Sequence, residues 1–512
     1  MVRAGATKAL TALAVCVSIA LALWCIVYAQ GDTEVFTPVH GLACRYPMAH
    51  LNTFEQGCDA YLIDFGLFRY HRAFEYAGGT SSLVYWPIWA LWKSPYSFYL
   101  FGAALLALFS CGLAKALDKP ARYALVPLCC FPLVYLFIQD SGPVRLALLS
   151  CPALALLLRG AHRDARISRQ IGFGALAAML VVVCVEDKPF YLLVAPTIFI
   201  CAFALGASID PSEGPAHVRA ALRRCAPALA TFGVIAAVGS GVVLFVGHTE
   251  GTTYFTYLRL RSHILGPQGF VTNVKYLFDY TLLQPVFARR AFGWNRPLRL
   301  VSTLSLVPAA AVLVYALWRA NAVTARMLGW MGAAYAAAAV VAFISNIERA
   351  PHHFVFLHLP LVLLLMHAAG RNAAGWRAVV GYLATSSVLS AAMLAWHAKP
   401  QDSREQDRVM AYLSREDVAA THVISALDLY DQQSVFGAPS QLVVAADPLD
   451  RTAPSDPAAL TGLARAVSRD ILYVCSTCSR PQVEAVFAGT TVDDIDIGVT
   501  AWKLFNVREA RR

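Results

Sequence analysis

The chain has 512 residues, of which 58% are hydrophobic and only 14% carry a charge. This composition, with a mean hydropathy of +0.54, departs from that of soluble domains in the direction of repeated bilayer spans. The formal charge of +10 does not indicate nucleic-acid binding, because the basic residues are scattered between apolar runs without a basic helix or an aromatic RNA-binding motif. We therefore expect an α-helical polytopic membrane protein.

The amino terminus has a basic start and a long apolar run without a small-x-small cleavage site, which favours a retained span over a signal peptide. Similar runs follow along the chain. Together they predict eleven spans, at 9–29, 97–117, 122–139, 144–158, 171–185, 190–207, 227–247, 300–318, 327–344, 354–369 and 378–397. The segment 83–92 is too short to cross and contains Pro87 among tryptophans, so we expect a re-entrant or interfacial helix there.

Orientation follows from the short loops, because lysine and arginine are retained on the cytoplasmic side. Alternate loops are rich in basic residues, and the loops between them are nearly bare of them. The basic loops contain Lys115, Lys119, Arg122, Arg159, Arg163, Arg166, Arg169, Arg219, Arg223, Arg224, Arg319, Arg326, Arg371 and Arg377. With the amino terminus inside, the loops 30–96 and 248–299 and everything after Ala398 are predicted to lie outside.

Cysteine usage agrees with this orientation. Nine of the thirteen cysteines lie in or beside apolar runs, where cysteine behaves as a small hydrophobe. The other four, Cys44, Cys58, Cys475 and Cys478, fall in segments predicted to lie outside, where an oxidising compartment permits disulfides. We expect a disulfide between Cys44 and Cys58. The CSTC pair is two thiols or half a metal site, and a single CxxC is weak evidence for zinc.

The tail changes character at about residue 400. The segment 401–417 reads as a helix, whereas THVISALDL, SQLVVAA and ILYVCST read as short strands. We expect a membrane domain over 1–399 and a small extracytoplasmic α/β domain over 400–512. The tail lacks a glycine-rich phosphate loop and a nucleophile elbow, so we assign it a recognition or supporting role.

Ionisable residues of the membrane domain gather in loops on the predicted outer side. Taken one at a time, such residues at helix ends are more often structural, but their coincidence favours a cavity that opens outward. The candidates are Asp59, Asp64, Arg69 and Arg72 in the first loop, Asp140 in the second, Glu186, Asp187 and Lys188 in the third, and Arg349, His352 and His353 late in the chain. His353 and His358 are five residues apart without an HExxH motif, so we predict no metal site.

The outer loop 248–299 is unexpectedly basic and carries interleaved tyrosines. One interpretation is that a long loop translocates regardless of charge and rests on anionic headgroups. The other is that its arginines hold a phosphate, for which the guanidinium fork is suited. We favour the second, with Arg259, Arg261, Arg289 and Arg290 as the candidate phosphate ligands.

The order of these parts resembles the C-superfamily (GT-C) of integral membrane glycosyltransferases, which includes protein O-mannosyltransferases and the lipid A aminoarabinose transferase. The similar motifs are an acidic first outer loop (CDAYLIDFG), an aromatic juxtamembrane stretch (SSLVYWPIWALWKSPYSFYLFGAALLALF), an outer acid after the third span (QDSGPVRLALL), a Lys-Pro element (VEDKPFYLLVAP) and a late aromatic span (APHHFVFLHLPLVLLL). The soluble outer tail also fits this architecture.

The resemblance implies a sugar donor linked to polyprenyl phosphate, a glycan, lipid or protein acceptor, and a multi-pass location in a bacterial plasma membrane. It also implies that a first-loop aspartate removes the proton of the acceptor hydroxyl. The family often pairs this aspartate with an adjacent glutamate, whereas Asp59 is followed by Ala60 and Tyr61. Asp59 and Asp64 are therefore both candidates, with Asp59 ranked first. The resemblance implies no certain cofactor and leaves a divalent metal open.

Three other functions compete with this one. A transporter would have an inverted repeat and acids on broken helices near the bilayer midplane, and neither pattern is visible in the sequence. A lipid-linked polysaccharide polymerase or ligase would also hold a lipid phosphate at the basic loop, but it leaves Asp59 without a role. A membrane scaffold predicts that changes at Asp59 or Asp64 leave function intact.

Overall fold

The computed structural model places the chain in two compact units. Unit 1 comprises Met1–Cys25, Phe101–Val246 and Leu258–His397, and unit 2 comprises Ile26–Leu100, Gly247–Tyr257 and Ala398–Arg512. The structure describes residues 2–28, 31–33, 36–38, 87–88, 91, 95–130, 133–134, 137–138, 142–161, 165–187, 191–192, 194–206, 215–249, 252–253, 359, 362–363, 365–366, 368–370, 373–397, 408–409, 412, 415–425, 442–444, 461, 464–465, 468–475, 479–500 and 503–509.

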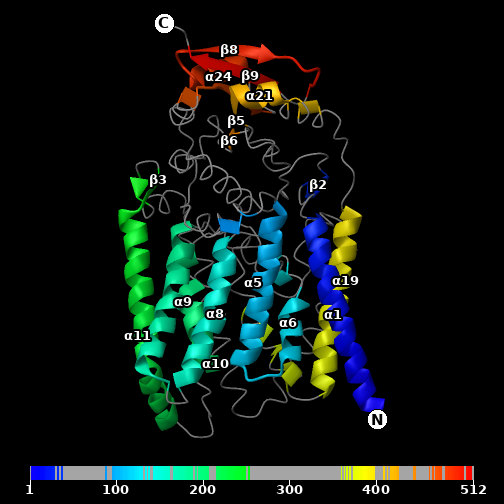
Figure 1. Cartoon of the computed structure of the whole chain (residues 1–512), viewed down its shortest axis with the longest axis vertical. Coiled ribbons are helices and arrows are strands. Elements are labelled where there is room, and N and C mark those ends of the chain that lie inside the picture. The colour runs from blue at the N-terminus through cyan, green and yellow to red at the C-terminus, as the bar shows by residue number, and fades with distance from the viewer. Residues whose placement is uncertain are drawn as a thin grey trace, which may run out of the picture. The chain divides into compact units, whose positions relative to one another are not determined.

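Unit 1 is built from apolar helices that lie side by side (Figure 1). The long ones are α1 (Val2–Tyr28), α5 (Pro95–Ala116), α8 (Gly142–Ala161), α9 (Ile167–Asp187), α10 (Val194–Gly206), α11 (Pro215–Val246) and α19 (Ala373–His397), and two short ones are η2 (Ala121–Ala124) and α6 (Leu125–Leu128). In the described part of the chain, three helical stretches are long and apolar enough to cross a bilayer: Val144–Ala161, Ile167–Glu186 and Arg219–Val246. The chain is a multi-pass membrane protein.

Small residues let these helices approach one another closely. A Cβ atom added to Gly174 of α9 would lie 2.5 Å from the carbonyl oxygen of Ala228 in α11, and one added to Gly239 of α11 would meet Val182 of α9 at the same distance. The second contact lies further along the chain than the first in both helices, so α9 and α11 run parallel. Close backbone approach at glycine is the usual way for helices to pack where the hydrophobic effect does not drive association.

Helix α11 has one face packed against other helices and one face exposed. Phe232 and Ala236 are buried against the other helices, whereas Val234, Val238 and Val242 are between 53% and 62% exposed. These valines recur every four residues and so form one row on the helix. An exposed row of β-branched apolar residues is unfavourable in water but suits contact with lipid chains.

Unit 2 contains two short antiparallel hairpins and a larger mixed sheet. The hairpins are β1 (Gly31–Thr33) with β2 (Phe36–Pro38), and β3 (His248–Thr249) with β4 (Thr252–Thr253). The sheet has the order β6–β5–β7–β9–β8. Its strands are β5 (His422–Ser425), β6 (Leu442–Val444), β7 (Asp470–Cys475), β8 (Thr490–Ile495) and β9 (Lys503–Glu509), and the helices α21 (Glu416–Thr421) and α24 (Arg480–Val486) accompany them.

Strands β5, β6 and β7 are parallel, and β9 runs antiparallel to β7 and β8. Ile471, Leu472, Tyr473 and Val474 of β7 are at most 3% exposed. Side chains of both faces of this strand are therefore covered, as expected for the centre of a sheet. Tyr473 also packs edge-on against Phe487, with the ring centroids 6.0 Å apart.

The predicted fold class is confirmed, because the described residues form apolar helices and a small carboxyl-terminal strand region. Several boundaries differ from the predictions. The predicted helix at 401–417 is interrupted at Arg415, whose backbone is extended before α21 begins at Glu416. The predicted span at 122–139 opens with the short helices η2 and α6, which end in a turn at Cys129 and Cys130. Helix α11 begins at Pro215 and passes through Pro227 without ending. The predicted spans at 300–318 and 327–344 lie outside the described residues.

Candidate functional site

Two of the predicted site residues, Glu186 and Asp187, fall in the described part of the chain. They form the last turn of α9. The remaining candidates lie outside the described residues, so their roles stay predictions: Asp59, Asp64, Arg69, Arg72, Asp140, Lys188, Arg259, Arg261, Arg289, Arg290, Arg349, His352 and His353, together with Cys44 and Cys58.

Glu186 and Asp187 lie at the end of unit 1 where α8 begins. Helices α8 and α9 are consecutive and packed together, so the end of α9 lies near the start of α8. Helix α10 runs parallel to α8, because its last residue, Gly206, packs against Ala155 and Leu158 near the end of α8. The start of α10 therefore joins the same end of the bundle.

A carboxylate is unfavourable at the carboxyl end of a helix, because the helix dipole places negative partial charge there. Glu186 and Asp187 occupy this position in α9, and Glu186 is partly exposed. Their roles as candidate site residues stay predictions.

Arg145, in the first turn of α8, is fully buried. Its Nη2 donates a hydrogen bond to the carbonyl oxygen of Ile138 at 2.8 Å. Helix α5 passes it at Gly102, where an added Cβ would lie 2.9 Å from the Cζ and 3.0 Å from the Nη2 of Arg145 and would collide with the carbonyl oxygen of Phe137. Only glycine permits this contact between α5 and the guanidinium.

A buried guanidinium carries a large desolvation cost, and an ionisable residue within a membrane helix is therefore a functional candidate. Arg145 was not among the predicted site residues, although it lies in the motif QDSGPVRLALL. Its sequence signal is weak, because Arg145 stands at the very start of the apolar run LALLSCPALALLL, where an arginine usually serves as an ordinary cation at a helix end.

The opposite end of unit 1 is basic. Exposed lysines and arginines lie near the first or last turns of its helices. They are Lys115, Arg122, Arg166, Arg169, Arg219, Arg223, Arg224 and Arg377. Among the described residues at this end, the one acid is Asp118, which pairs with Arg159 at 2.5 Å. The described ionisable groups are thus segregated, with the carboxylates of α9 and the buried Arg145 at one end and the exposed cations at the other.

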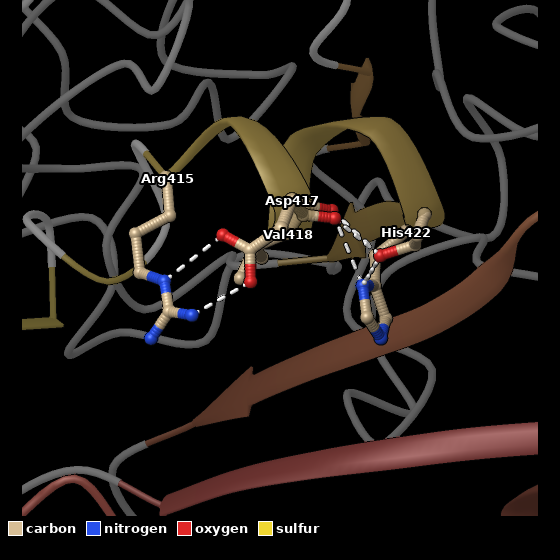
Figure 2. A network of polar contacts seen from close by, with 5 residues as sticks. Arg415, Asp417, Val418 and His422 are labelled. Carbon is tan, nitrogen blue, oxygen red and sulfur yellow. Dashed lines mark hydrogen bonds and ion pairs between the residues drawn. The ribbon is translucent and has the colours of Figure 1, made fainter.

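A second polar network lies in unit 2, around α21 (Figure 2). Arg415 donates two hydrogen bonds to Asp417, at 3.0 and 2.6 Å, and these hold the pKa of that carboxyl below its ordinary value. His422 Nδ1 lies 2.7 Å from the Thr421 hydroxyl and 3.1 Å from the Val418 carbonyl oxygen. The Val418 carbonyl oxygen also accepts the backbone N–H of His422, so the histidine caps the end of the helix through both its backbone and its ring. This network joins α21 to β5 and has a structural role.

Within the described ranges, no group of three His, Cys, Asp or Glu residues lies together in a way that could hold a metal ion. Most of the predicted polar loops lie outside those ranges. The prediction that the protein lacks a metal site therefore stays a prediction.

No family model and no curated protein matches the chain. Among solved structures, the apo oligosaccharyltransferase of Archaeoglobus fulgidus is 11% identical with a TM-score of 0.43, covering 90% of this chain and 69% of the other. ArnT of Cupriavidus metallidurans bound to undecaprenyl phosphate is 13% identical with a TM-score of 0.48, covering 97% of both chains. Its apo structure has a TM-score of 0.39 at 13% identity, covering 98% of both chains.

Proposed function

We propose that the protein is a membrane glycosyltransferase. In this proposal it moves a sugar from a polyprenyl-phosphate carrier to a hydroxyl of a lipid, glycan or protein acceptor at the outer face of the plasma membrane. Asp59 is the general base, with Asp64 as the second candidate. The motifs of the first outer loop and the order of spans and loops support this assignment.

The structural observation that carries the proposal is the polar end of unit 1. Arg145 is buried in the first turn of a membrane helix, and Glu186 and Asp187 end the neighbouring helix at the same end of the bundle. A fixed positive charge in a water-excluded site stabilises negative charge that develops nearby. A departing lipid phosphate develops such charge, and its isoprenoid tail can stay in the bilayer beside the apolar helices.

The reaction requires one bond to form and one to break. The acceptor oxygen attacks the anomeric carbon, while the bond from that carbon to the phosphate oxygen breaks and its electron pair leaves with polyprenyl phosphate. The acceptor proton passes to the Asp59 carboxylate. Because the attack comes from the face opposite to the departing phosphate, the anomeric configuration inverts. Arginines of the basic loop, with Lys188 and Arg349 as further candidates, neutralise the leaving phosphate.

The test compares cells that lack the protein with cells that carry the wild type, Asp59→Asn or Asp64→Asn. Mass spectrometry of membrane lipids and surface glycans measures the transferred sugar. Asparagine keeps the shape of aspartate but removes the proton acceptor. Asp59→Asn is therefore expected to abolish the product although the variant still folds, and cells that carry it are expected to accumulate polyprenyl-phosphate sugar.

Other outcomes lead to other assignments. Loss of the product in Asp64→Asn alone would exchange the roles of the two aspartates. A product retained in both variants would remove the main support for a glycosyltransferase and favour a ligase or a scaffold. Paired Arg289→Gln and Arg290→Gln changes test the loop, and unchanged donor use would mean that it rests on headgroups.

A further inference from the structure

The turn that follows α5 has a rigid and well-defined geometry. The Lys119 amide donates to the Ala114 carbonyl at 2.9 Å and the Asp118 amide donates to the Lys115 carbonyl at 3.1 Å, while Asp118 has a φ of 56°. This pair of hydrogen bonds around a left-handed residue is a Schellman motif. Pro120 ends the turn and caps η2. The backbone therefore fixes where Lys119 and Arg122 leave the helix.

The acid in this turn is already neutralised. Arg159 Nη2 lies 2.5 Å from the Asp118 carboxylate, and its Nη1 donates to the carbonyl oxygens of Lys115 and Ala116 at 3.0 Å each. Arg159 thus satisfies two carbonyls at the end of α5 and the neighbouring carboxylate together. Among the described residues, the ion-pair partner of Asp118 is Arg159 and not Lys119 or Arg122.

Arg122 lies against an aromatic shelf. Its Cζ is 5.4 Å from the ring centroid of Tyr123 and 5.9 Å from that of Trp376, and these two rings meet edge to face at 5.0 Å. The Tyr123 hydroxyl donates to the Ala369 carbonyl at 3.3 Å, which holds the shelf in place. A guanidinium held by ring faces keeps its N–H edge available for a planar or tetrahedral anion. None of the described side chains accepts a hydrogen bond from that edge.

Lys119 lies beside the same segment, the one that contains Ala369 and precedes α19. A Cβ added to Gly370 would lie 2.9 Å from both the Cε and the Nζ of Lys119, so the ammonium rests on the chain next to Ala369, the partner of Tyr123. The Arg122 guanidinium and the Lys119 ammonium thus both lie at the junction where the turn after α5 packs on the segment before α19. No described carboxylate pairs with either of them.

We propose that this junction binds the phosphate of an anionic phospholipid. Lys119 and Arg122 hold the headgroup, and the Tyr123–Trp376 shelf, whose two rings are buried, keeps the Arg122 guanidinium in place. The bound group is a lipid because the site caps apolar helices and lies at the basic end of the bundle, which the sequence predicts to face the anionic cytoplasmic leaflet. This site is independent of the proposed transferase reaction at the other end.

The test uses the full-length protein in detergent, titrated with phosphatidylglycerol and followed by native mass spectrometry. Each basic residue near the membrane surface contributes about 1 kcal/mol. Lys119→Gln combined with Arg122→Gln is therefore expected to raise the dissociation constant of the most tightly bound phosphatidylglycerol about 30-fold. The matched control is Arg223→Gln combined with Arg224→Gln, which removes the same charge from α11 and is expected to leave that affinity unchanged. Lys119→Arg combined with Arg122→Lys keeps the charge and is expected to retain most of the binding.

Three results would overturn the proposal. Equal losses in the test and control pairs would mean a diffuse attraction to the whole basic end. Equal affinity for phosphatidylcholine would remove the role of the anionic headgroup. Displacement of the lipid by excess inorganic phosphate, with phosphate then bound at Lys119 and Arg122, would show a soluble anion site.

Discussion

Gly102 is the residue at which α5 comes close to the buried guanidinium. Gly102→Ala places a Cβ against the carbonyl oxygen of Phe137 and 2.9 Å from the Arg145 Cζ, so backbone or guanidinium must move. We expect a loss of about 1–3 kcal/mol, as for other overpacked sites, measured as a lower apparent melting temperature. Gly233→Ala is the control, because a Cβ there meets nothing within 4 Å. Equal melting temperatures for the two variants would contradict the close approach at Gly102.

Asp118 combines a backbone role with an ionic one. Asp118→Ala puts a residue poorly suited to positive φ at 56°, at a cost of about 1–2 kcal/mol. Asp118→Asn removes the charge but keeps a side chain that tolerates this conformation, so we expect it to lose less, about 0.2–1 kcal/mol for an exposed pair. Thermal unfolding of both variants separates the effects. If asparagine destabilises as much as alanine, the ion pair with Arg159 is the more important contribution.

At the scale of elements, α21 begins with the Arg415–Asp417 pair (Figure 2). A lowered pKa contributes stability that is fully present above the unfolded pKa of about 3.9 and disappears as the pH falls through the lower folded value. Arg415→Gln is expected to raise the pKa of Asp417 toward its ordinary value, measured by the carboxyl 13C shift during an acid titration. Asp417→Asn assigns the signal. Arg480→Gln, which instead removes the partner of Glu484 and Asp494, should leave the Asp417 pKa unchanged.

The elements that could be predicted are those whose side chains face one environment. Strand β7 reads as an apolar run because both of its faces are covered, and β5 and β6 also contain short apolar runs. Strand β8 was missed because its sequence TTVDDI mixes one buried valine with exposed acids, and β9 was missed because polar Asn506 and Arg508 interrupt its apolar residues. The early start of α11 was missed because Pro227 reads as a helix start, whereas the helix continues through it.

At the scale of the whole molecule, the eleven predicted spans place the carboxyl terminus outside. A reporter that is active only outside the cytoplasm, fused after Arg512, is therefore expected to be active, and one that requires the cytoplasm is expected to be silent. Fusions after Ala161, at the basic end of α8, provide the opposite control. Cytoplasmic activity of the Arg512 fusion would reverse the predicted side of every candidate site residue.

The candidate site could be predicted only as a region. Loop acids such as Glu186 stand out in a chain with few charges, and their side of the membrane follows from the basic loops. Arg145 could not be assigned in this way, because its importance depends on burial and on the approach of Gly102 from another helix. Both are tertiary contacts, and neither the period nor the composition of α8 encodes them.

The length of α11 has a consequence for the membranes in which the protein works. From Cys225, just after its arginines, to Val246 the helix rises about 33 Å, close to the hydrocarbon thickness of about 30 Å. Arginines anchor it at headgroup level at one end, whereas Val246 at the other is 64% exposed and apolar. A change in acyl-chain length is therefore taken up at the unanchored end, where Glu186 and Arg145 also lie. The length of the lipid tails therefore changes the position of the polar end of the bundle relative to the bilayer surface.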